Sequence, residues 1–353
     1  MTITSEDLLA GPRGRDLCLR WALSCSYDAG AGARRFADAT RDATFHLSRE
    51  AGFCFTGVVA SSDLDAAPDA DEDPPWPSAA EVAALLPEVP VGIPDDTRLL
   101  HCLWRSVDDA AYWQPPDGDE ALAATPEMRA ALVPVAEQIA RASGTAWWST
   151  PVRRDDQWLV DFAPGESRAP APDPATLLAT WRWREASGGL WWSVPPQELA
   201  RSTRALDGSG PVGLALVEAG HGWDEAVAHR VSVAPDARIL EIDDPGDWAG
   251  LARRHPVDVT SEHGHDWDEV TGRPGPWVRP DWSRVAEEYD GVHLTVTGYL
   301  STAGRAIDIG DGRAAVLAGW DPDQTYWLTD AAHVTGPAVR WVRGDQPIWT
   351  PAG

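Results

Sequence analysis

The feature that most constrains the fold of this chain is a change of hydrophobic pattern across one proline-rich segment. Before the segment, apolar residues recur at helical spacing; after it, they alternate with polar residues, as half-buried strands require. The segment itself, Ala163 to Ala175, reads APGESRAPAPDPA, and its prolines stiffen an exposed connection. A chain of 353 residues is also longer than one hydrophobic core usually grows. We therefore expect an α+β protein with a mostly helical domain over 1–163, a linker over 164–175 and a mixed α+β domain over 176–353.

Helix-start signals recur along the first domain. Pro12 suits the first turn of a helix, and Ser78 with Glu81 forms a capping box that opens another. Pro126 opens a further helical stretch, which Pro134 interrupts. The predicted helices of this domain cover 12–24, 33–50, the stretch that follows Ser78 and the stretch that follows Pro126.

The second domain mixes alternating segments with short helical ones. Alternation of apolar and polar residues over a few positions is typical of strands, and helical spacing over about ten residues is typical of helices. Strands are predicted at 180–185, 190–194, 211–218, 229–233, 237–242, 291–296, 314–320 and 325–330. Helices are predicted at 195–206, 246–255 and 281–289.

The charge of the chain limits its partners. With 55 acidic and 29 basic residues, the formal net charge is −26. Such a charge repels phosphate backbones, which argues against a broad nucleic-acid surface or an anionic membrane, although a local arginine pocket can still hold one phosphate group. The acidic, proline-rich run at 61–78 cannot support packing, so we expect it to be a solvated loop.

The cysteines and the N-terminus favour a cytoplasmic protein. The cysteines lie in the first third of the chain without metal-ligand spacing, which is typical of buried thiols in a reducing compartment. They are Cys18, Cys25, Cys54 and Cys102. We recognise no secretory signal and no apolar run that approaches about 18 residues, so neither export nor a membrane span is expected.

A candidate ligand site lies in the predicted hairpin TWRWREASGGLWWSV. A period of two places Arg182 and Arg184 on one face of the first strand, and the turn that follows returns Trp192 and Ser193 alongside it. An arginine can bind a pyrophosphate through two hydrogen bonds while an aromatic ring stacks on a planar base. We therefore predict that Arg182, Arg184, Trp192 and Ser193 bind a ligand.

A structural interpretation of the same hairpin stays open. Its tryptophans can fill a core, because tryptophan is the main bulky aromatic in a chain with only five Phe and five Tyr. Ser193 could instead be the N-cap of the next helix. Its hydroxyl would then need a backbone N–H from Pro195 or Pro196, and proline has none. A near copy of the hairpin's second strand, WWSTP at 147–151, is interpreted with WWSVP as an aromatic strand start that packs at the domain junction.

Several short motifs of the second domain resemble the ADP-ribosyltransferase fold. They are the arginine-bearing strand, the aromatic-Ser strand, a Pro-led helix with Ala200, YDGVHL at 289–294 and GWDPDQTYWL at 319–328. The resemblance covers roughly residues 175 to 330. It implies that an arginine anchors NAD and that the aromatic-Ser strand contacts the nicotinamide ribose. It also implies that the strand preceded by Tyr289 closes the sheet, and Tyr289 is therefore a further candidate ligand residue.

The chain departs from that family where the catalytic glutamate is expected. The corresponding strand reads RAAVLAGW at 313–320 and contains no acid. Without a carboxylate to stabilise the oxocarbenium-like ribose, transfer should be slow or absent. The fold is then retained as a binding scaffold, or another acid such as Asp321 or Asp323 substitutes.

A histidine-rich stretch, SEHGHDWDE at 261–269, is a candidate metal-binding segment. His263 and His265 on an extended segment could chelate a divalent metal. A polar loop can have much the same sequence, and no HExxH-type spacing accompanies the histidines. No metal is therefore predicted.

The leading functional hypothesis is that an ADP-ribosyltransferase-like domain binds a nucleotide-type ligand, NAD or ADP-ribose-like, with NAD as its cofactor. The alternative is a non-catalytic protein-interaction module whose acidic, Trp-rich surface binds a protein partner. A third hypothesis, a carbohydrate-directed enzyme with two carboxylates, is permitted by the abundance of Asp and Glu, but spacing singles out no pair.

Overall fold

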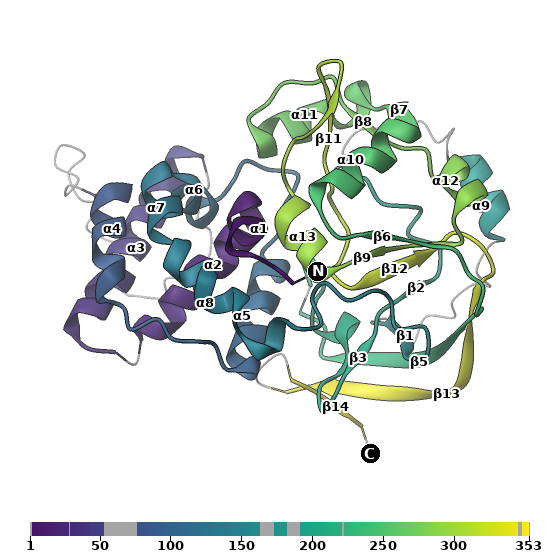
Figure 1. The fold of residues 1–353 in the computed structure, drawn as a ribbon, viewed down its shortest axis with the longest axis horizontal. Helices are drawn as coiled ribbons and strands as arrows, with labels where there is room; N and C mark the ends of the chain where they lie inside the picture. The colour runs from purple at the N-terminus through teal and green to yellow at the C-terminus, as the bar shows by residue number, and fades with distance from the viewer. Residues whose placement is uncertain are drawn as a thin grey trace, which may run out of the picture.

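The computed structural model describes residues 2–27, 29–52, 76–162, 173–181, 191–220, 222–344 and 348–352. Figure 1 shows a helical part, with α1 to α8, beside a part in which small sheets are surrounded by α9 to α13. The α+β class expected from the sequence is confirmed. None of the helices in the described ranges combines the length and the apolar character that crossing a membrane requires.

The helical part follows the predicted start signals closely. Its elements are α1 (Ser5–Ala10), α2 (Pro12–Ser26), α3 (Ala31–Glu50), α4 (Ala79–Leu85), η1 (Leu86–Glu88), α5 (Asp96–Asp108), α6 (Gly118–Ala124), α7 (Pro126–Ala131) and α8 (Val133–Ala140). The capping box before α4 is confirmed, because the Ser78 hydroxyl accepts from the Glu81 backbone N–H and the Glu81 carboxylate accepts from the Ser78 N–H. Pro134 lies at the start of α8, just after the break between α7 and α8.

The α+β part contains two four-stranded sheets. The first has the order β1-β5-β13-β14 and is antiparallel throughout. The second has the order β2-β12-β9-β6, in which only the β6–β9 pair is parallel. The strands of these sheets are β1 (Gln157–Asp161), β2 (Arg201–Ser202), β5 (Glu225–Val233), β6 (Ile239–Ile242), β9 (Gly291–Leu294), β12 (Gln324–Trp327), β13 (Ala332–Arg343) and β14 (Trp349–Pro351).

Short pairs and helices complete this part. The two-stranded pairs are β3 (Ala205–Leu206) with β4 (Gly210–Pro211), β7 (Pro256–Asp258) with β8 (Val278–Pro280), and β10 (Ile307–Gly310) with β11 (Arg313–Ala315). The helices are η2 (Ser143–Thr145), α9 (Pro174–Trp181), η3 (Val212–Leu214), α10 (Pro245–Arg254), α11 (Thr260–Thr271), α12 (Trp282–Glu288) and α13 (Val296–Thr302).

Segments with strong local signals were predicted correctly. The strands at 229–233, 237–242, 291–296 and 325–330 correspond to β5, β6, β9 and β12, and the helices at 246–255 and 281–289 to α10 and α12. The strand predicted at 314–320 is confirmed only at its start, in β11.

Other predictions for this domain were wrong where the structure describes the residues. The helix at 195–206 is a turn followed by β2 and β3, because Pro195 and Pro196 provide no donors for a helical ladder. The strand at 211–218 continues from β4 into η3, and the described residues of 190–194 form no strand. Of the strand at 180–185, the first two residues end α9 and the rest lies outside the described residues. The polar loop at 261–269 is part of α11.

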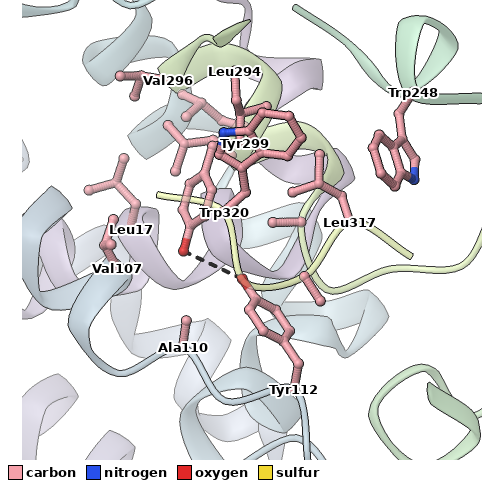
Figure 2. Close-up of a cluster of buried hydrophobic side chains, with 14 of the residues drawn as sticks. Leu17, Val107, Ala110, Tyr112, Trp248, Leu294, Val296, Tyr299, Leu317 and Trp320 are labelled. Carbon is pink, nitrogen blue, oxygen red and sulfur yellow. Dashed lines mark hydrogen bonds between the residues drawn. The ribbon is translucent and has the colours of Figure 1, made fainter. Parts of the chain in front are cut away.

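One apolar core extends through both parts of the molecule. Figure 2 shows Leu17 and Val107 of the helical part gathered with Tyr299 and Trp320 of the α+β part. All four side chains are fully buried. Residues far apart in the sequence are therefore held together at this junction.

The junction lies earlier in the chain than the predicted linker. Strand β1 was counted with the first domain, but it pairs with β5 and so belongs to the α+β part. Of the predicted linker, only 173–175 lies within the described residues, at the start of α9. The acidic loop at 61–78 is described only from Trp76 onward.

Candidate functional site

Of the five predicted ligand residues, the structure describes Trp192, Ser193 and Tyr289. Arg182 and Arg184 lie outside the described residues. Ser193 is fully buried, and its hydroxyl accepts a hydrogen bond from the Ala318 N–H at 3.1 Å. The Trp192 carbonyl lies 3.2 Å from a ring nitrogen of His263.

Tyr289 is the residue that directly follows α12, and its hydrogen bonds involve other residues than those of Trp192 and Ser193. Its hydroxyl accepts a hydrogen bond from Arg254 at 3.2 Å. Within the described ranges, no hydrogen bond joins Tyr289 to Trp192 or Ser193. The predicted convergence of these residues on one ligand therefore stays a prediction.

A groove at the junction of the two parts combines arginines, aromatic side chains and a carboxylate. It consists of three adjoining hollows, which we call the outer cleft, the neck and the inner pocket. The outer cleft, about 550 Å³ in volume, lies between α5 and the β3–β4 hairpin, with Arg98, His101 and Trp104 on the α5 side. Its volume is in the range of small-molecule sites, which are commonly concave and mostly apolar.

The neck is a small hollow that shares wall residues with the outer cleft and with the inner pocket. It shares Trp104 and Trp349 with the outer cleft, and Phe162 and Trp223 with the inner pocket. Its free volume is only about 10 Å³, and Arg343 lies on its wall. Because neighbouring hollows share wall residues, the three lie side by side, and we call them together the junction groove.

The inner pocket has aromatic walls and a polar end. Its volume is about 120 Å³, and Trp158, Phe162 and Trp223 form its aromatic side. Arg201, Asp321 and Gln324 form the polar end. The three aromatic side chains are half-buried, so a ligand can reach them.

Local backbone geometry places the polar end. The WDPDQ turn runs from Trp320 into β12, and Asp323 adopts a left-handed conformation there, with φ of 59°. Asp323 can tolerate that conformation because Asp and Asn are enriched in it. Strand β12 then pairs with β2, which brings Tyr326 opposite Arg201, whose guanidinium lies 5.8 Å from the Tyr326 ring centroid.

Hydrogen bonds fix the carboxylate and the amide of this end. Asp321 accepts from the Glu218 N–H and from the Gln324 side-chain amide, both at 2.9 Å. Gln324 is 7% exposed, and its Oε1 accepts no hydrogen bond from the part of the chain that the structure describes. An unpartnered buried acceptor costs stability unless a water or a ligand satisfies it.

The two acids that the sequence suggested as substitutes for the missing glutamate have different environments. Asp321 lines the inner pocket, where a ligand can meet it. Asp323 is 2% exposed and is bound to the guanidinium of Arg204 at 2.6 Å. Only Asp321 is therefore available to a ligand in the groove.

Glu218 lies directly behind the inner pocket and was not singled out in the sequence. Its Oε1 accepts a hydrogen bond of 2.5 Å from the Tyr112 hydroxyl, which lies 3.5 Å from the Tyr299 hydroxyl (Figure 2 shows the two tyrosines). Burial, and then the charge of Asp321, raise the pKa of Glu218 to about 8. Burial also raises the pKa of Asp321. Glu218 therefore holds a proton at neutral pH, and a carboxyl group that keeps its proton there is a feature shared with acid–base sites.

His293 belongs to a second buried charge network, which we interpret as structural. Its two ring nitrogens contact Glu241 and Asp323, the latter at 3.4 Å. Burial opposes the charge on the ring, but hydrogen bonds to Asp323 and Glu241 outweigh it and raise the pKa of His293 to about 9. With both nitrogens occupied, the imidazolium links β6, β9 and the turn before β12 and leaves no nitrogen for a substrate.

The His-x-His chelate considered for the histidine-rich stretch does not form. On α11, His263 is buried and His265 is exposed, because residues two apart lie on nearly opposite faces of a helix. A search of the described ranges finds no group of three or more His, Cys, Asp or Glu side chains arranged to hold a metal ion.

Comparison with known proteins adds no relative from which a ligand could be inferred. The chain matches no protein-family model, no curated protein and no solved structure.

Proposed function

We propose that the chain binds a nucleotide-type ligand, of the NAD or ADP-ribose kind, in the junction groove. The observation that supports this most is the repeated pairing of one arginine with aromatic walls along the groove. Arg98 accompanies Trp104 in the outer cleft, Arg343 lies in the neck, and Arg201 lies in the inner pocket. A guanidinium binds phosphate oxygens through two parallel hydrogen bonds, and aromatic rings stack on bases.

The two roomy hollows of the groove suit different parts of a nucleotide. The outer cleft has room for a sugar and its phosphates, and the inner pocket has room for one flat group, whereas the neck has no more free volume than a single water molecule needs. The acidic chain as a whole repels anions, so the arginines must act locally. The sequence predicts the same chemistry for Arg182 and Arg184, which lie outside the described residues, and the present proposal assigns it to Arg98, Arg343 and Arg201.

Calorimetric titration of the full chain with NAD and with ADP-ribose tests the proposal. Arg98→Gln should weaken binding about tenfold or more, since it removes a charge-assisted contact. Arg141→Gln is the matched control, because Arg141 is exposed at the end of α8, where it pairs with Glu137, and lies outside the groove. Absence of binding by both ligands, or equal effects of the two substitutions, would contradict the proposal.

An assay for released nicotinamide, run beside the titration, separates binding from turnover. Binding without release supports a scaffold that lacks catalysis, as the missing glutamate predicts. Release that Asp321→Asn abolishes would instead assign the catalytic carboxylate to the inner pocket.

Protein docking is the alternative that a negative titration would favour. Among the described tryptophans, only Trp113 is exposed, at 40%, and the others are buried or half-buried. A docking surface on the described residues would therefore depend on acidic side chains more than on tryptophan.

A further inference from the structure

We infer that the inner pocket holds a planar ring whose edge carries an N–H donor beside a C=O acceptor, as in a nucleobase or an aromatic carboxamide. This inference rests on the proposed function in treating the junction groove as a ligand site. It goes further in assigning the flat end of the ligand, and not its phosphates, to the inner pocket.

The size and the walls of the pocket select a single flat ring. Its volume of about 120 Å³ is close to that of a cavity that accommodates benzene, on the order of 150 Å³. Phe162 and Trp223 stack on one another with ring centroids 4.6 Å apart and planes inclined by 13°, which makes a flat aromatic side. Trp158 is held in place by a hydrogen bond of 2.9 Å from its indole N–H to Asp156. Aromatic side chains favour offset stacking or edge contact with another ring.

The polar end selects the ring's edge. Gln324 Oε1 is a buried acceptor without a donor among the described residues, although the amide nitrogen of the same side chain is fixed by Asp321. The main-chain oxygen of Gln324 is held as well, by the Trp320 indole N–H at 3.0 Å. The orphaned oxygen is therefore held in position, and a ligand N–H would satisfy it.

Arg201 provides the complementary donor. Its guanidinium lines the same pocket and lies over the Tyr326 ring, and an arginine can donate but not accept. A ligand carbonyl beside the N–H would match Arg201 and Gln324 together. A phosphate fits this end poorly, because the Asp321 carboxylate lines it too and like charges repel.

The test uses small probes and ligand-observed NMR titration of the full chain. The probes are uracil, hypoxanthine and benzamide, with benzene as the ring without a polar edge and ribose 5-phosphate as the ring-free part of a nucleotide. We expect at least one of the ring amides to bind, benzene to bind more weakly, and ribose 5-phosphate to leave the bound probe in place.

Variants locate the probe. Gln324→Met keeps the size of the side chain and removes its acceptor, and it should weaken probe binding about tenfold. Val217→Phe should abolish binding by filling the pocket that Val217 lines, which keeps the inference testable if Gln324→Met fails to fold. Gln138→Met on α8 is the matched control and should change nothing. Thermal unfolding of each variant confirms that it is folded.

The outcomes separate this inference from the proposed function. If NAD binds with the expected sensitivity to Arg98→Gln while no ring amide binds, or while Gln324→Met and Val217→Phe leave probe binding unchanged, the inference is overturned and the proposed function stands. If a ring amide binds as expected while neither NAD nor ADP-ribose binds, the inference stands and the proposed function is overturned.

Discussion

Glu218 gives the most direct test of the buried acid cluster behind the inner pocket. In Glu218→Gln the side chain keeps its size and can still accept the hydrogen bond from Tyr112. The variant therefore resembles the protonated wild-type residue but has no proton to lose.

The expected effect on stability depends on pH and follows from the raised pKa of Glu218. In the unfolded chain this carboxyl loses its proton near its ordinary pKa of 4.5, whereas the folded protein keeps the proton up to about pH 8. Between these values the folded state binds one proton more than the unfolded state, so the free energy of unfolding falls as the pH rises. The slope is about 1.4 kcal/mol per pH unit, which amounts to about 5 kcal/mol over the whole interval.

Glu218→Gln removes this slope. Its free energy of unfolding should be close to that of the wild type near pH 5 and exceed it by about 5 kcal/mol at pH 8, because only the wild type has a carboxyl that ionises in the unfolded chain while the folded protein keeps it protonated. Urea unfolding of both proteins at each pH from 5 to 8, followed by tryptophan fluorescence, measures the difference. Other titrating groups are common to both proteins and cancel in that difference.

The control is Glu137→Gln, which changes an exposed carboxylate on α8 and should give a curve parallel to that of the wild type. A wild-type and Glu218→Gln difference that stays constant between pH 5 and pH 8 would refute the reasoning, because it would mean that Glu218 is already ionised in the folded protein at low pH.

Three further substitutions test the surroundings of the groove by urea unfolding. Gly319→Ala should cost about 2 kcal/mol or more, because φ is 80° there and a Cβ would lie 2.8 Å from the neighbouring Trp192 side chain; an unchanged midpoint would contradict this geometry. Asp323→Asn should cost about 3 kcal/mol or more by leaving the buried Arg204 guanidinium without its charge partner, and a neutral result would mean that the pair is solvated. Ser193→Ala should cost about 1 to 3 kcal/mol by leaving a buried backbone N–H unpaired, while NAD affinity stays unchanged; lost affinity would return Ser193 to the ligand site.

The helices and several strands could be predicted because their signals are local. Pro12 at the start of α2 and the Ser78–Glu81 capping box before α4 act within one helical turn, so the sequence alone contains the whole interaction. The alternation in β5 likewise reports that one of its faces is buried. The α+β class follows from these elements.

Other elements were mispredicted because alternation or helical spacing was overridden by tertiary contacts. The stretch 211–218 reads as a strand, yet Val212 to Leu214 form η3, which packs at the wall of the groove. The opposite signal was present in α11, where His263, Trp267 and Val270 are spaced for one buried helical face. Because the residues between these three are mostly polar, the segment was interpreted as a loop instead of a helix.

The sequence by itself determined the class of the fold, the positions of the locally capped helices and the strongly acidic net charge. Only the tertiary structure decided which of the many acids is buried and which arginines line the junction groove. Glu218 and Tyr112 are 106 positions apart in the chain, and Arg201 meets Gln324 and Asp321 only through the pairing of β2 with β12. A pKa or a binding site depends on distances of a few ångströms between such groups, and those distances exist only once the chain has folded.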